Sequence, residues 1–166
     1  MKIPRFVPTA IVLAIAAGAC GSDAEALTKS EYIEQADAIC QSVDDEIAPM
    51  FDEFFSDLES QGIDLEAEMP TDTVFVGYAR VWNEMVSAWD DSLQDLRALG
   101  KPEGDEKMLE RLLDDLESAL ADSVVVVDAA ADGSEADRLA MEDYDPFHDV
   151  NARARVYGLA VCGSDG

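Results

Sequence analysis

Apolar residues recur at intervals of three and four through most of this 166-residue chain, in stretches far longer than the segments between them. Such spacing places the apolar side chains on one face of an α-helix. No segment keeps the strict alternation that is typical of a half-buried strand. The sequence therefore predicts an all-α fold: a four-helix bundle-like domain over residues 28–166, after an N-terminal signal segment.

The first predicted helix follows a capping box at Thr28-Lys29-Ser30-Glu31, in which Thr28 and Glu31 exchange hydrogen bonds across the first turn. Its apolar positions run from Tyr32 to Leu58. Pro49 lies inside this stretch, so we expect a kink or a break there. A second helix is expected from about Asp72 to Leu99, before a stop signal over residues 100–104.

The third predicted helix runs from about Asp105 to Ala131. It includes the four valines 124–127, which favour a strand by propensity but continue the helical period. Residues 134–141 can form one further short helix. The last helix is expected to begin at Asp145-Pro146, with the aspartate as N-cap and the proline in the first turn, and to end at Gly163.

The first twenty residues have the layout of a secretory signal. Lys2 and Arg5 form a short basic head, and the apolar run Phe6–Ala17 follows. Small residues then precede Cys20, which resembles the cysteine of a bacterial lipobox. In such signals the cysteine thiol receives a diacylglycerol and becomes the new N-terminus. The expected organisation is a signal peptide over 1–19, a tether over 20–27 and an acidic helical domain over 28–166.

Two other interpretations of this segment stay open. The residue three before a lipobox cysteine is most commonly leucine, and here it is Ala17. An ordinary signal cleaved near Ala19 would leave a secreted protein with Cys20 as a free thiol. An uncleaved signal anchor fits less well, because the apolar run of about a dozen residues is shorter than the ~20 that a spanning helix needs.

The charge balance is extreme, with 11 Lys and Arg against 37 Asp and Glu. The net charge of −26 becomes −28 once the two cations of the signal, Lys2 and Arg5, are removed. Nucleic acid is excluded as a partner, because binding requires neutralisation of phosphates by Lys and Arg. The charge also argues against a domain lying flat on anionic lipid. Solubility is the simplest role for this acidity, and binding of a cation or of a basic partner is the alternative.

The chain has three cysteines. If Cys20 is acylated, Cys40 and Cys162 remain, and an oxidising compartment favours a disulfide between them. The bridge would close a loop of about 120 residues and stabilise the fold by roughly 5 kcal/mol on the loop-entropy model. The alternative is two unrelated buried thiols.

Trp82 and Trp89, two turns apart on the second helix, face the same way. Such aromatics are usually core residues, and the alternative is that they line a ligand groove.

Three segments, QADAIC (35–40), DPFHDVN (145–151) and YGLAVCG (157–163), resemble those of a widespread group of small secreted or lipid-anchored helical proteins of actinobacteria. In that group an early Ala-Asp-Ala-x-Cys and a terminal Tyr-Gly-Leu-x-x-Cys-Gly recur. The similarity covers both ends of the mature chain, and the middle is matched only in its helical character. The resemblance implies an extracytoplasmic location and a disulfide, and it implies no activity.

Several chemistries are excluded by the residues themselves. The only histidine is His148, so a histidine-rich zinc site is impossible. No G-x-S-x-G nucleophile elbow and no glycine-rich phosphate loop occurs. No acidic cluster follows the calcium-loop pattern. We therefore predict no catalytic residue, metal ligand or cofactor. The leading hypothesis is a non-enzymatic, lipid-anchored envelope protein with a binding or structural role and an unidentified protein partner. The alternative is a solute- or cation-binding module that uses the acidic surface or the Trp82/Trp89 face.

Overall fold

The computed structural model describes residues 26–63, 72–133 and 144–164, and these contain three long helices and one short one. The long helices are α1 (Lys29–Ser60), α2 (Asp72–Ala98) and α3 (Glu106–Asp132), and the short one is α5 (His148–Tyr157). No strand occurs among the described residues. The all-α, bundle-like prediction is confirmed. The expected short helix over residues 134–141 lies outside the described residues.

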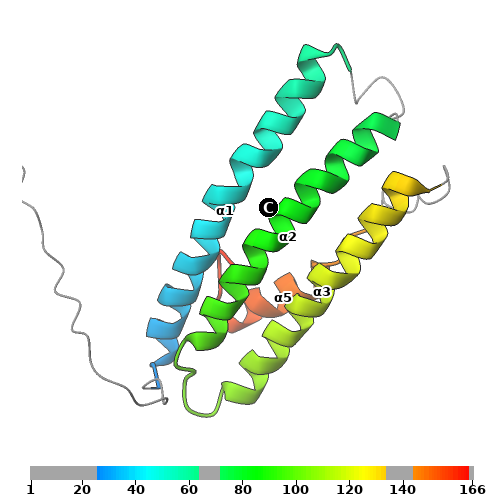
Figure 1. The fold of residues 1–166 in the computed structure, drawn as a ribbon. Coiled ribbons are helices and arrows are strands. Elements are labelled where there is room, and N and C mark those ends of the chain that lie inside the picture. The colour runs from blue at the N-terminus through cyan, green and yellow to red at the C-terminus, as the bar shows by residue number, and fades with distance from the viewer. Residues whose placement is uncertain (1–25, 64–71, 134–143, 165–166) are drawn as a thin grey trace, which may run out of the picture.

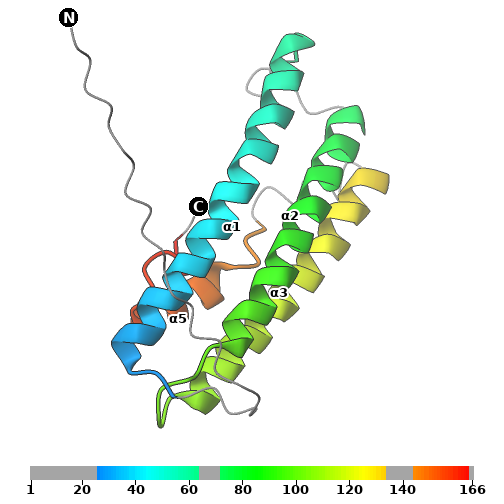
Figure 2. The same ribbon diagram turned by 60° about the vertical axis from the view of Figure 1, so that its left-hand side comes forward.

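The three long helices form a row with α2 in the middle (Figure 1), and α2 packs against both α1 and α3. The short helix α5 packs against α3. In both views it lies against the half of the row where α1 begins, and the chain after it passes close to α1 (Figure 2). With a rise of 1.5 Å per residue, α5 is about 15 Å long and α3 about 40 Å. The fourth helix therefore covers only part of the row.

The largest hydrophobic cluster lies at the end of the row that α5 covers, and all four helices contribute to it. Its buried members are Tyr32, Ala36 and Cys40 of α1, Leu93 and Leu96 of α2, Leu109, Leu112 and Leu113 of α3, Val150, Ala154 and Tyr157 of α5, and Leu159. At the other end, the described members of the buried cluster come from α1 and α2: Phe54, Leu58, Val74 and Val81. Between them lies a small cluster of Val43, Ile47 and Met85.

Helix α1 begins as predicted and continues further than predicted. The Thr28 Oγ1 accepts a hydrogen bond from the Glu31 backbone N–H at 3.3 Å, and the Glu31 carboxylate accepts one from the Thr28 N–H at 2.9 Å. We expected a kink or a break at Pro49, and the break does not occur, because α1 is one helix through this residue. Pro49 lies on the exposed side, while buried Ile47 and Phe54 hold the apolar face on α2 to either side of it. The valine run 124–127 is helical, as predicted.

The last helix is shorter than predicted at both ends. It begins at His148 rather than at Asp145-Pro146, and the Asp145 carboxylate instead accepts a hydrogen bond from the Phe147 N–H at 3.1 Å. It ends at Tyr157, because Gly158 has φ +114°, a left-handed conformation that closes a helix and favours glycine. The chain then turns and buries Leu159, which is 4 % exposed. Gly163 is therefore not the cap, and Cys162 lies in the loop after the helix.

Gly163 is required for a close backbone approach. The residue is buried, and a Cβ atom there would lie 2.8 Å from both the Arg155 backbone nitrogen and the Leu159 carbonyl oxygen. Both atoms belong to the backbone, so neither can rotate away. The second glycine of the YGLAVCG segment thus allows the C-terminal loop to fold back onto the end of α5.

Candidate functional site

Cys40 and Cys162 form a disulfide, as the sequence predicts, with Cα atoms 5.2 Å apart. Cys40 is 1 % exposed and lies in the largest hydrophobic cluster. Because Cys162 lies in the loop after α5, the bridge ties this loop to α1 rather than joining two helices.

The carboxylate of Asp37 binds the same loop one helical turn before Cys40. Its Oδ2 accepts a hydrogen bond from the Ala160 N–H at 3.0 Å. Its Oδ1 accepts bonds from the Val161 and Cys162 N–H groups at 3.0 and 3.2 Å. One side chain thus satisfies three consecutive backbone donors. Asp37 lies within the QADAIC segment, and no role was predicted for it. Its position three residues before the bridged Cys40 is the signal that the sequence offers.

Two side chains of α5 complete this arrangement. The Asn151 amide donates to the Ser164 carbonyl at 2.9 Å, and the Arg155 guanidinium donates to the Gly163 carbonyl at 2.6 Å. We call the set formed by Asp37, the disulfide, Asn151, Arg155 and the loop 158–164 the C-terminal clasp. The segments quoted for the resemblance, which are far apart in the sequence, all take part in it. In this chain the three segments therefore have a structural role.

A cavity of about 390 Å³ lies beside the C-terminal clasp, between the row of long helices and residues 145–164. Trp82 and Trp89 were predicted to face the same way, and both line this cavity. We call it the aromatic cavity. Its apolar lining is Ile47, Phe51, Trp82, Met85, Trp89, Leu116, Phe147 and Val161, and its other lining residues are Asp44, Asp145, Asn151, Cys162 and Ser164.

The two tryptophans are both core residues and cavity-lining residues. Each is half-buried and packs against the small cluster around Val43 and Met85. The indole N–H of Trp82 donates to the Ser123 hydroxyl at 2.9 Å, and its ring stacks on Phe147 with centroids 6.4 Å apart. The ring is thus held in place by Ser123, which does not line the cavity, and by Phe147, which does.

The charged residues that line the aromatic cavity are both acidic, Asp44 and Asp145, and no Lys or Arg of the described residues lines it. Asp145 is engaged, because it accepts from the Phe147 N–H and lies 3.6 Å from the His148 imidazole. Asp44 is half-buried and has no hydrogen-bond or ion-pair partner among the described residues. Burial raises the pKa of Asp44, and the neighbouring carboxylate of Asp45 raises it further.

A second cavity, of about 460 Å³, lies where α1 begins, among residues of α1, α3 and α5. Basic side chains line this cavity, but they already interact with other groups of the protein. The Lys29 ammonium lies 4.1 Å from the centre of the Tyr157 ring, and Arg153 pairs with Asp115. The Tyr157 hydroxyl donates to Asp105 at 2.9 Å, and burial, together with Asp105, raises the pKa of this hydroxyl. These contacts hold the helices together.

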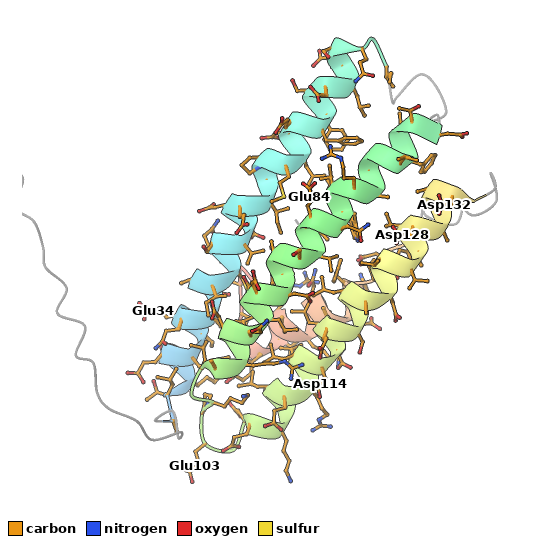
Figure 3. The ribbon with its side chains drawn as sticks, in the orientation of Figure 1. Glu34, Glu84, Glu103, Asp114, Asp128 and Asp132 are labelled. Carbon is orange, nitrogen blue, oxygen red and sulfur yellow. A yellow bond between two sulfur atoms is a disulfide. The ribbon has the colours of Figure 1, made fainter. Side chains whose placement is uncertain are left out.

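The acidic surface is spread over the whole domain. The labelled carboxylates of Figure 3 lie on α1 (Glu34), on α2 (Glu84), in the α2–α3 connection (Glu103) and along α3 (Asp114, Asp128, Asp132). All six are exposed. Among residues 26–63, 72–133 and 144–164, no group of three His, Cys, Asp or Glu side chains converges to hold a metal ion. His148 is a surface residue, with a side chain that is 71 % exposed.

The predicted lipidation residue Cys20 lies outside the described residues. Among the helices that the structure describes, none has the length and apolar character to span a bilayer. No protein-family model, curated protein or solved structure matches the chain. The similarity to the actinobacterial group therefore rests on the three quoted segments.

Proposed function

We propose that the chain is a lipid-anchored, extracytoplasmic protein that acts as a non-enzymatic binding protein and holds a small ligand in the aromatic cavity. The lipobox-like segment that ends at Cys20 supports the anchor, and the resemblance of the three quoted segments supports the location. The observation that carries the binding role is that Trp82 and Trp89 line one cavity.

The composition of the aromatic cavity is that of a ligand site. Such sites are concave, mostly apolar and aromatic, with a few polar groups that fix orientation. The volume of about 390 Å³ lies within the usual range of 300–1,000 Å³. The polar groups gather on the wall formed by Asp145, Asn151 and Ser164, and Asp44 adds one from α1. The C-terminal clasp would fix part of this wall.

Replacing Cys20 by Ser is expected to release the protein from the membrane fraction. A diacylglycerol with an N-linked acyl chain supplies at least two chains, which is enough for stable attachment where a single chain is marginal. Fractionation of cells that express each form, followed by immunoblotting, measures the effect. A Cys20→Ser protein that stays in the membrane at full length would instead indicate a signal anchor. An unmodified wild-type Cys20 in released protein would indicate plain secretion.

Ligand binding in the aromatic cavity is expected to change tryptophan emission, because the chain has only two tryptophans and both line the cavity. Titration of the soluble Cys20→Ser protein with tert-butylbenzene, a neutral apolar probe, should give a saturable change. Leu116→Phe replaces a branched aliphatic side chain of the cavity lining with a larger aromatic ring and should weaken binding about tenfold or more. The matched control is Val125→Phe, which puts the same ring on an exposed position of α3. Equal binding by both variants would contradict the assignment.

A further inference from the structure

The aromatic cavity combines aromatic faces with an unneutralised negative charge. The Asp44 carboxylate is half-buried and has no partner among the described residues. Partial burial removes part of the water around this carboxylate, and a cation beside it would offset that loss. This chain has nine Lys and Arg after the signal, and none of those in the described residues lines the cavity. A cation from outside the chain would fill the position that a Lys or Arg side chain leaves open.

We propose that the aromatic cavity selects an organic cation, namely a small ammonium compound whose nitrogen carries apolar substituents. This inference rests on the proposed function, since it requires that the aromatic cavity binds a ligand at all. The apolar substituents would pack against Met85, Leu116 and Val161. The positive charge would lie between the indole rings and the Asp44 carboxylate.

The aromatic rings favour such a charge. The face of an indole ring carries a partial negative charge, and a cation within about 6 Å of the ring centre is attracted to it. Tryptophan gives the strongest attraction of the aromatic side chains, and the effect grows when the cation is desolvated. Trp82 is held by its bond to Ser123 and its stack on Phe147. Its ring therefore needs little reordering when a ligand enters.

The field of the whole domain acts in the same direction. A net charge of −26 on the full chain, spread over all the helices, raises the local concentration of cations and speeds their arrival. The same field repels anions. A hard divalent cation is a poor alternative, because Ca²⁺ takes six to eight oxygen ligands and most of this cavity wall is carbon. An inorganic ion would also leave the apolar lining without a partner.

A matched pair of probes separates charge from shape. Phenyltrimethylammonium and tert-butylbenzene have the same outline and differ in the charged nitrogen. Both are titrated into the Cys20→Ser protein, with tryptophan emission and calorimetry as readouts. We expect the cation to bind about tenfold more tightly than the neutral probe, which corresponds to a cation–π attraction in a desolvated site. Added sodium chloride should weaken binding of the cation and leave binding of tert-butylbenzene unchanged.

The variant Asp44→Asn tests the carboxylate and should weaken phenyltrimethylammonium about tenfold while leaving tert-butylbenzene within about twofold. The matched control is Glu46→Gln, an exposed residue of the same helix outside the cavity lining, which removes the same charge from the surface. Asp44→Asn should not lower the melting temperature, because the folded protein disfavours the ionised form. If Asp44 had only a structural role, its substitution would not lower the affinity for the cation while leaving the stability of the protein unchanged. Trp89→Leu supplies a second variant that removes an aromatic face and should also weaken the cation preferentially.

The outcomes separate this inference from the proposed function. Equal affinities for the two probes, unchanged by Asp44→Asn, would overturn the cation selectivity and leave the aromatic cavity as a site for neutral ligands. Equal weakening by Asp44→Asn and Glu46→Gln would also overturn it, because the attraction would then belong to the whole acidic surface. An absence of saturable binding by either probe would overturn both the inference and the binding role.

Discussion

The double variant Cys40→Ala/Cys162→Ala is expected to unfold at clearly lower denaturant concentration than the parent protein, with a loss of about 2–5 kcal/mol in the free energy of unfolding. The bridge joins residues 122 apart in sequence, so the unfolded chain gains much freedom when it is removed. A net stability of about 5–15 kcal/mol is typical of a domain, so this loss is a large fraction of the total.

The measurement is urea unfolding of the Cys20→Ser protein, followed by circular dichroism and by tryptophan emission. Both cysteines are replaced together, because one remaining thiol can form intermolecular disulfides. The parent protein treated with a reductant serves as the control, and it should lose stability to a similar extent. Unchanged unfolding midpoints for the double variant and the reduced parent would contradict a stabilising disulfide at this position.

The disulfide was predictable from the sequence, but its position in the fold was not. The signal segment indicated an oxidising compartment, and two cysteines remained once Cys20 was set aside. Helical periodicity then suggested that Cys162 continues the last helix. The left-handed conformation at Gly158 ends that helix at Tyr157. The side-chain amide of Asn151 donates a hydrogen bond to the Ser164 carbonyl in the loop that follows. A glycine followed by a leucine is compatible with a continuing helix until tertiary packing buries Leu159.

The long helices were predictable because each has apolar residues at helical spacing over many turns. A few residues that disfavour helix do not outweigh the burial of these apolar side chains. The valines 124–127 illustrate this: packing of the apolar side chains on α2 overrides their strand propensity. Pro49 is a second example, although here a kink or a break was expected. Helix α1 remains continuous through this proline, a residue that is unfavourable inside a helix. A proline inside a helix costs about 3 kcal/mol, and burial of one large apolar side chain contributes about 1.5–3 kcal/mol. Several buried side chains of α1 together therefore outweigh Pro49. The strand preference of the valines is smaller and is outweighed more easily.

The aromatic cavity was only partly predictable. The spacing of Trp82 and Trp89 placed both rings on one face of a helix, but spacing cannot tell a filled core from a cavity. The difference arises from the length of α5, which covers only one end of the row of long helices. In the sequence, Asp44 is one of 37 acidic residues, and nothing distinguishes it from the others. Its lack of a partner among the described residues and its place at the cavity depend on how four separate segments meet, which is information that no single helix contains.

The three hydrogen bonds that Asp37 accepts lead to the second large expected effect. Asp37→Ala is expected to lower the free energy of unfolding by about 2–4 kcal/mol, because hydrogen bonds to a charged group contribute about 1.5–3 kcal/mol each and part of this returns when water solvates the freed N–H groups. The loss should appear in urea unfolding with the disulfide intact. Glu34→Ala is the matched control, since Glu34 is an exposed carboxylate one turn earlier on α1 (Figure 3). Surface substitutions of this kind usually change stability by no more than about 0.5 kcal/mol.

The variant Asp37→Asn grades the same effect. An amide keeps one oxygen acceptor and replaces the other with an N–H donor, so it can serve the Val161 and Cys162 N–H groups or the Ala160 N–H group, but not both sides. We expect its stability to lie between those of the parent and Asp37→Ala. In the background without the disulfide, the loop 158–164 is free to move away, and Asp37→Ala should then cost less than in the parent. Equal costs in the two backgrounds would show that Asp37 and the disulfide hold the loop independently, and the C-terminal clasp would not be one cooperative unit.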